Sequence, residues 1–137
     1  MAMNRTLWIR LAAVSGLLSV VAGAFAAHRI TDPQAREWLR TGASYQAIHA
    51  LAALLSLALF PNPGPTARRV PAIFLAGTVF FSGSLYAMAL GGPRWLGAVT
   101  PLGGLLFLAG WGILAWSASN GERSDAQGVK AGVAGDP

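Results

Sequence analysis

One apolar segment of the chain carries a tyrosine, an amide and an imidazole in neighbouring positions. Tyr45 and His49 are four residues apart, and Gln46 and His49 are three apart, so an α-helix brings the three side chains to adjacent positions. These groups can donate and accept hydrogen bonds, and an imidazole can also carry a proton or ligate haem iron. The segment continues without a charged residue to Phe60. Polar groups on so apolar a helix need partners inside the protein.

The composition indicates a membrane protein and excludes several kinds of function. Of the 137 residues, 54% are hydrophobic and 11% are charged, whereas about a quarter of the residues of a soluble domain are charged. The chain therefore has too little polar surface to cover a soluble globule. The absence of cysteine excludes disulfides, thiolate metal sites and thiol catalysis. The net charge of +5 is scattered between apolar blocks, so we expect no nucleic-acid partner.

Four apolar segments predict four transmembrane helices. At about 1.5 Å per residue, about 20 residues cross the ~30 Å hydrocarbon core of a bilayer. We expect an all-α membrane protein whose four helices form an antiparallel bundle, followed by a disordered polar tail over residues 119–137. The expected spans of the domain (residues 1–118) are 7–27, 43–60, 70–90 and 96–118.

Residues 28–42 predict a short interfacial helix between the first two spans. Pro33 suits the first position of this helix. Trp38 would anchor the helix among the lipid headgroups. Gly42 would then break the helix before the chain enters the membrane again.

The start of the chain also fits a cleaved signal peptide. Arg5 precedes an apolar stretch, and Ala24 to Ala26 match the small-x-small cleavage pattern. Arg10 interrupts that stretch and three further spans follow. We therefore expect the first helix to be retained.

The basic residues predict how the chain is oriented. Four spans place both termini on one side of the membrane, and basic residues near span ends favour the cytoplasm. The terminal side carries the larger share of these residues, so we expect both termini to be cytoplasmic. The two sets are Arg5, Arg10, Arg68, Arg69, Arg123 and Lys130 on the terminal side, against Arg29, Arg36, Arg40 and Arg94.

Alternating span directions predict a small polar pocket near one membrane face. If the second span begins near Ala43, His49 lies only roughly five residues inside it. Ionisable groups within spans are costly and often mark functional sites. The alternative is that these side chains are interfacial belt residues or link helices by hydrogen bonds. The candidate residues are His28, Glu37, Tyr45, Gln46, His49, Ser82, Tyr86 and Thr100.

His49 is the residue that we expect at the centre of any site. A lone charged imidazole inside a span would be costly, so we expect a neutral ring held by hydrogen bonds. Its expected partners lie on the third and fourth spans. They are Tyr86, Ser82 and Thr100.

No catalytic pattern accompanies this pocket. The sequence has no paired carboxylates and no phosphate-binding loop, and Ser82-Gly83-Ser84 lacks the nucleophile-elbow spacing. Two histidines in a helical bundle suggest haem ligation, but His28 and His49 would lie on adjacent helices at similar depth, where facing a porphyrin is awkward. We therefore expect no enzyme, no cofactor and no metal site.

Four stretches occur in a characteristic order: Gly23 to His28, Tyr45 to Leu51, Phe81 to Tyr86, and Thr100 to Gly104 with Gly110-Trp111. Together they resemble the domain-of-unknown-function family 423, and the resemblance covers about residues 5–118. It implies a retained first helix and a four-helix protein of the bacterial inner membrane. It implies no activity, so no catalytic role is carried over. Ala26 and Arg29 stand where glycines are expected beside His28, which disfavours a cation or proton role there.

Two hypotheses about function follow. The leading one is a non-enzymatic membrane protein that acts by association, through small-residue helix faces or the helix that bears Trp38. The alternative is binding or transport of a small ligand, a lipid or a proton through the polar pocket. The expected partners are the lipid bilayer and a second copy of the chain or another membrane protein.

Overall fold

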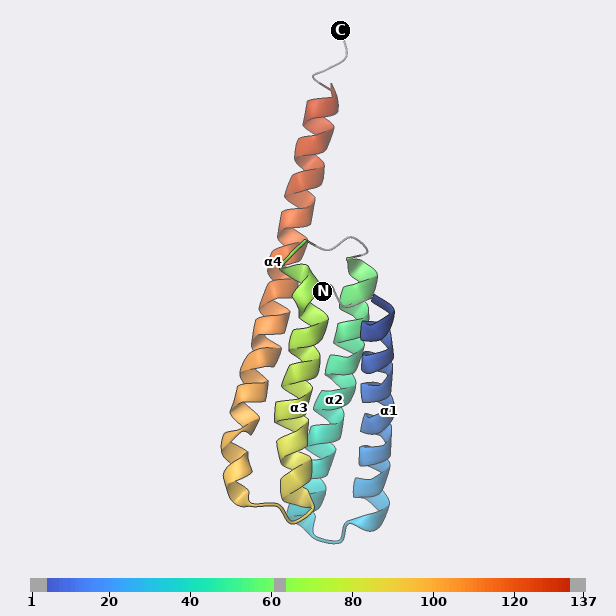
Figure 1. Cartoon of the computed structure of the whole chain (residues 1–137), viewed down its shortest axis with the longest axis vertical. Coiled ribbons are helices and arrows are strands. Elements are labelled where there is room, and N and C mark those ends of the chain that lie inside the picture. The colour runs from blue at the N-terminus through green and yellow to red at the C-terminus, as the bar shows by residue number, and fades with distance from the viewer. Residues whose placement is uncertain (1–4, 61–63, 134–137) are drawn as a thin grey trace.

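The computed structural model describes residues 5–60 and 64–133, with side chains as far as Ser119. In these ranges the chain is all-α, and its helices provide four candidate membrane spans by length and composition (Figure 1). The predicted four-span architecture is confirmed. The long helices are α1 (Arg5–Arg29), α2 (Pro33–Leu59), α3 (Val70–Ala89) and α4 (Thr100–Val133), and the short 3-10 helices are η1 (Ala67–Arg69) and η2 (Arg94–Ala98).

The helices pack mainly in chain order. α2 packs on α1 and α3, and α4 packs on α3, whereas α1 and α3 meet only weakly. Figure 1 shows α1 and α4 at opposite edges, with α2 and α3 between them. The central helices bury 44% of their span residues, against 22% in α1 and 17% in α4. The two edge helices therefore present most of their apolar surface to the surrounding bilayer.

α2 is one continuous helix, where the sequence predicted an interfacial helix that ends at Gly42. The Asp32 carboxylate caps its start by accepting from the Ala35 N–H at 2.7 Å, and Pro33 occupies its first turn. Gly42 lies inside the helix, and Tyr86 of α3 packs against it. A Cβ at this position would lie 2.6 Å from Tyr86 Cε1. The glycine thus serves close packing and does not break the helix.

The longer α2 changes the depth of its polar residues. Its 27 residues extend over about 40 Å. Gln46 is the fourteenth of these residues and His49 is the seventeenth. Both therefore lie near the middle of the helix, where the sequence placed them close to one membrane face.

α4 continues to Val133, well past the boundary expected at residue 118. Residues 119–133 are helical where the sequence predicted a disordered tail. This segment contains three glycines, which disfavour a helix, but it extends an existing helix and so avoids the cost of nucleation. Figure 1 shows the extension projecting beyond the other helices. Residues 134–137 of the expected tail lie outside the described residues.

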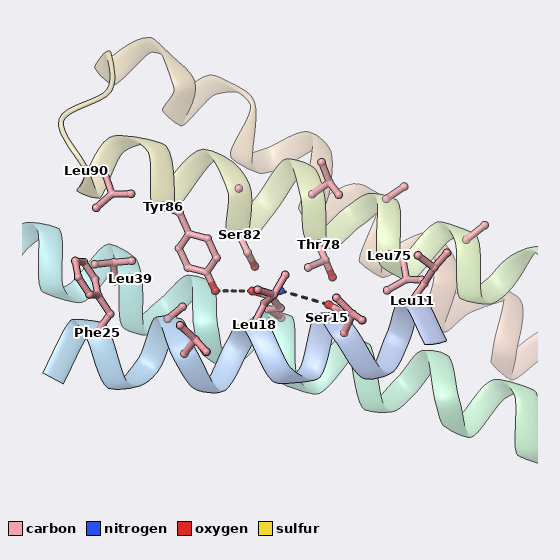
Figure 2. Close-up of a pocket in the computed structure, with 18 of the residues that line it drawn as sticks. Leu11, Ser15, Leu18, Phe25, Leu39, Leu75, Thr78, Ser82, Tyr86 and Leu90 are labelled. Atoms are coloured by element: carbon pink, nitrogen blue, oxygen red, sulfur yellow. Dashed lines mark hydrogen bonds between the residues drawn. The ribbon is translucent and has the colours of Figure 1, made fainter. Parts of the chain in front are cut away.

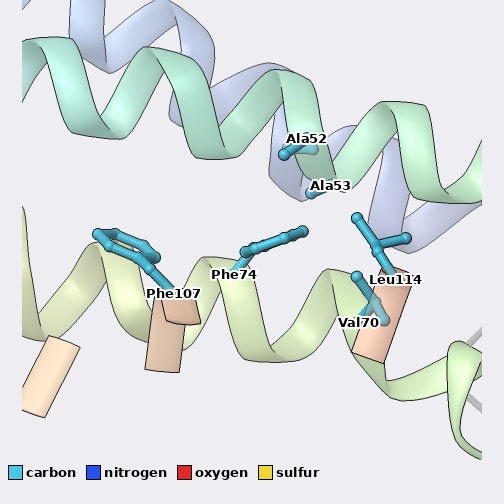
Figure 3. Close-up of a cluster of buried hydrophobic side chains, with 7 residues drawn as sticks. Ala52, Ala53, Val70, Phe74, Phe107 and Leu114 are labelled. Atoms are coloured by element: carbon cyan, nitrogen blue, oxygen red, sulfur yellow. The ribbon is translucent and has the colours of Figure 1, made fainter. Parts of the chain in front are cut away.

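Figure 3 shows the buried core. It lies toward the end of the bundle where the two chain termini are, since its residues in α1 and α3 come from the first halves of these helices and those in α2 from the second half. Gly110 lets α4 approach α3 there, since a Cβ on Gly110 would lie 2.5 Å from Cε1 of the fully buried Phe74. Small residues at such contacts allow membrane helices to pack closely. The buried cluster is Ala12, Ala52, Ala53, Val70, Phe74, Phe107 and Leu114.

Candidate functional site: a groove with a polar floor

A groove of about 830 Å³ lies between α1 and α3, with α2 beneath it. Figure 2 shows Leu11, Leu18 and Phe25 of α1 along one wall, and Leu75 and Leu90 of α3 along the other. The α1 residues are spaced by seven, so they share one helical face. The groove therefore follows the helix axes, with apolar walls.

Three hydrogen-bonded side chains from three helices cross the floor of this groove. The Tyr86 hydroxyl of α3 donates to Gln46 Oε1 of α2 at 2.6 Å, and Gln46 Nε2 donates to Ser15 Oγ of α1 at 3.4 Å (Figure 2). Gln46 and Ser15 are buried. The amide of Gln46 thus links the two helices that form the walls, at the middle of α2.

The floor keeps hydrogen-bonding capacity for a ligand. Gln46 uses one of its two amide N–H donors in the bond to Ser15. The hydroxyls of Ser82 and Thr78 donate to the carbonyls of Gly42 and Phe74, at 2.7 and 3.0 Å, and each oxygen still has acceptor capacity. The described residues that line the groove include no charged side chain. The floor can therefore bind an uncharged polar group, but it offers no partner for a full charge.

His49 lies outside this groove and is held in an aromatic cluster. Its Nδ1 is 2.8 Å from the Tyr45 carbonyl, and the Trp111 indole N–H donates to its Nε2 at 3.3 Å. A carbonyl only accepts, so Nδ1 carries the proton and Nε2 accepts, which describes a neutral ring. The ring stacks on Phe107 of α4, with centroids 3.4 Å apart. Both ring nitrogens are engaged within the protein.

The partner of His49 differs from the prediction. The expected contact with the third or fourth span is present, since Trp111 belongs to α4. Sequence reasoning did not propose Trp111 as a partner of His49, since Gly110-Trp111 entered only as one of the stretches that carry the family resemblance. The predicted partners make other bonds; they are Tyr86, Ser82 and Thr100.

His28 does not join the network. It is exposed in the last turn of α1. His49 lies 16 positions beyond Pro33, the first residue of α2, or about 24 Å along the helix. The two histidines therefore do not converge on one haem. In the described part of the chain, no group of three histidine or acidic side chains is placed to hold a metal ion.

The other three predicted site residues also lie apart from the floor. Glu37 is exposed and accepts a hydrogen bond from Thr41 one turn later, at 3.3 Å. Thr100 pairs with Ser84, their hydroxyl oxygens 2.7 Å apart, and so links α4 to α3. Tyr45 is 43% exposed and packs its ring on residues of α3 and α4.

The structure thus brings together three of the eight predicted residues, namely Gln46, Ser82 and Tyr86. Sequence reasoning missed Ser15 and Thr78, because isolated hydroxyls in apolar runs are common in membrane helices. The signal for Ser15 was its place in a stripe with Ser19 and Gly23 spaced by four. That spacing predicts helix packing, and α1 indeed buries Ser15 and Ser19.

Comparison with known proteins identifies relatives of this chain. Residues 22–104 match the profile of a family described as "Protein of unknown function (DUF423)". The UPF0382 inner membrane protein YgdD of Escherichia coli K12 is 43% identical over 113 residues, which cover 75% of this chain and 82% of the relative. UPF0382 membrane proteins of Haemophilus influenzae and Staphylococcus haemolyticus are 39% and 38% identical, covering 80% and 77% of this chain and 90% and 88% of the relatives. No solved structure matches the chain. The resemblance predicted from the four sequence stretches is confirmed.

Proposed function

Since the chain belongs to the DUF423 family of unknown function, we propose from its own geometry that it binds an uncharged amphiphile of the bilayer between α1 and α3. The groove holds the apolar chain of this molecule, and Gln46 with its neighbours binds the polar group. The protein acts by binding and not as an enzyme. The observation that carries the proposal is the hydrogen-bonded floor halfway along an otherwise apolar groove.

The chemistry of the groove supports an uncharged ligand. A volume of about 830 Å³ falls within the range of about 300–1,000 Å³ typical of small-molecule sites. Leu18 and Val79 on the rims are 50% and 69% exposed, so the groove is open to molecules that diffuse in the lipid. A charged headgroup at the level of Gln46 would lose its hydration without gaining a counter-charge. A hydroxyl or carbonyl group avoids that cost.

The structure gives less support to association as the main function. A surface-binding helix around Trp38 would have to be separate from the second span, but Trp38 lies in the first turns of the continuous α2. The small residues Ala12, Ser15 and Ser19 of α1 are buried. They already serve packing within the chain, which favours the ligand-binding alternative.

We also propose that the protein resides in a bacterial inner membrane, with both termini in the cytoplasm. The name of the Escherichia coli relative, an inner membrane protein, supports the proposed location. The basic residues support the orientation, because six of the ten belong to the side of the termini.

Gly83 offers a way to block the groove without disturbing the fold. It lines the groove, and a Cβ at this position would meet no atom within 4 Å. Gly104 of α4 has the same free space but lies outside the groove, so it provides a matched control. Gly83→Leu and Gly104→Leu each gain up to about 1 kcal/mol of helix propensity. Neither substitution is therefore expected to destabilise the protein.

The experiment uses the purified full chain in detergent micelles with a photoactivatable long-chain fatty alcohol, and mass spectrometry locates the label. We expect labelling of the groove walls that falls several-fold in Gly83→Leu and is unchanged in Gly104→Leu. Gln46→Leu should still bind a photoactivatable hydrocarbon of equal length but lose the preference for the alcohol. Equal labelling of the two glycine variants would refute the proposal.

A further inference from the structure

A second cavity lies outside the groove, between the C-terminal half of α1 and the start of α2. Its volume is about 490 Å³, and none of its residues lines the groove. Its surface combines two arginines and a serine with three residues that have no side chain beyond Cβ. The lining residues are Gly23, Ala27, Arg36, Arg40, Ala43 and Ser44.

The two arginines are placed to act together. Arg36 and Arg40 are four residues apart, so their side chains share one face of α2. The Arg36 guanidinium donates from Nε and Nη2 to the Ile30 carbonyl, at 3.0 and 2.7 Å. These bonds fix its position and leave other N–H groups free. Arg40 is exposed, and in the part of the chain that the structure describes it makes no hydrogen bond or ion pair.

The nearby acidic side chains do not neutralise these arginines. The Asp32 carboxylate caps α2 by accepting from the Ala35 N–H, and Glu37 accepts from Thr41. Neither carboxylate forms an ion pair with Arg36 or Arg40 among the described residues. The cavity therefore keeps an excess of positive charge.

The position of the cavity along α2 corresponds to the headgroup region of a bilayer. α2 has 27 residues and extends over about 40 Å, longer than the ~30 Å hydrocarbon core. Arg36 and Arg40 lie in its first two to three turns, and arginine side chains extend readily to the interface. Gly23 and Ala43 lie deeper, toward the middle of their helices. The cavity thus has a cationic outer end and a narrow, small-residue inner end.

We propose that this cavity binds the phosphate of an anionic phospholipid. Arg36 and Arg40 donate to the phosphate oxygens, since guanidinium groups match the geometry of phosphate, and the Ser44 hydroxyl adds a donor. Gly23 and Ala43 close the inner end of the cavity, since a Cβ at Gly23 would lie 3.9 Å from Ala43 Cβ. The acyl chains therefore pass from the cavity into the bilayer beside the exposed Ala27. Basic pockets between membrane helices bind anionic headgroups by this chemistry. The cavity shares no lining residue with the groove, so this proposal does not depend on the proposed function.

Arg40→Gln is the primary variant, because among the described residues Arg40 has no partner whose loss would disturb the fold. Arg94→Gln is the matched control, since Arg94 is an exposed arginine in η2, outside the cavity. Native mass spectrometry of the full chain in micelles that contain phosphatidylglycerol and phosphatidylcholine counts the lipids that stay bound. We expect wild type and Arg94→Gln to prefer one phosphatidylglycerol. Arg40→Gln should weaken that preference roughly fivefold, the contribution of one basic residue near an anionic headgroup.

Ala27→Trp separates a lipid from a free phosphate ion, because its bulky ring obstructs the exposed path of the acyl chains and leaves both arginines in place. We expect it to reduce phosphatidylglycerol binding while binding of inorganic phosphate stays unchanged. Equal losses in Arg40→Gln and Arg94→Gln would show that general surface charge attracts the lipid, and would overturn the proposal. Unchanged lipid binding by Ala27→Trp would overturn the proposed path of the acyl chains beside Ala27.

Discussion

Replacing Gly42 with alanine tests whether this glycine exists to accommodate Tyr86. A Cβ at Gly42 would lie 2.6 Å from Tyr86 Cε1 and 3.1 Å from its Cδ1, well inside the contact distance of about 3.5–4.0 Å between two carbons. The Tyr86 ring would have to move away from α2. Its hydroxyl would then lose the 2.6 Å hydrogen bond to Gln46.

The net effect of Gly42→Ala on the free energy of unfolding follows from three contributions. Overpacking of this kind costs about 1–3 kcal/mol, and losing the hydrogen bond between Tyr86 and Gln46 costs about 0.5–1.5 kcal/mol more. The higher helix propensity of alanine offsets about 1 kcal/mol. We expect Gly42→Ala to destabilise the protein by about 0.5–3.5 kcal/mol.

The assay is tryptophan fluorescence during unfolding of the micelle-bound protein by sodium dodecyl sulfate, and the control is a double-mutant cycle. In a Tyr86→Leu background no ring is displaced, so Gly42→Ala should be neutral or stabilising by up to about 1 kcal/mol. This reversal of sign is specific to the packing of the Tyr86 ring on Gly42. An equal loss of stability in both backgrounds would refute the reasoning.

Two further predictions concern His49 and the orientation. Trp111→Phe should destabilise the protein by about 1 kcal/mol because His49 Nε2 loses its donor, and the loss should vanish in a His49→Leu background when measured by the same unfolding assay. Cysteines placed at Gln34 and Thr66 should react differently with an impermeant thiol reagent on intact cells, with labelling at Gln34 alone. Labelling at Thr66 alone would reverse the orientation.

The bounds of α2 show which local sequence rules predict a helix end correctly and which do not. Pro33 was correctly placed at a helix start, because its fixed φ and missing N–H act within one turn. At Gly42 the low intrinsic helix propensity of glycine predicts a break. The helix nevertheless continues through Gly42, where the missing side chain leaves room for Tyr86, forty-four residues later in the chain. Helix propensity depends on the residue and its neighbours in sequence, whereas the residue that packs against Gly42 belongs to another helix.

The same limit applies to the candidate site. Gln46 and Tyr86 were singled out because a polar side chain in an apolar span must find a partner. Their pairing, and the inclusion of Ser15, depend on how far each helix is rotated and shifted against the next. His49 is only three residues from Gln46, yet it meets Trp111 of α4 instead of the groove. The predicted depth of Gln46 and His49 is also wrong, because it assumes that the second helix begins near Ala43 and not at Pro33.

The sequence by itself determined the membrane class and the number of spans, because a segment of about 20 apolar residues is driven into a bilayer by its own composition. Only the tertiary structure decided which polar residues meet. Helix rotation and register are set by contacts such as Gly42 with Tyr86 and Gly110 with Phe74. Each contact joins residues of two different helices, so it cannot be predicted from the sequence of either helix alone.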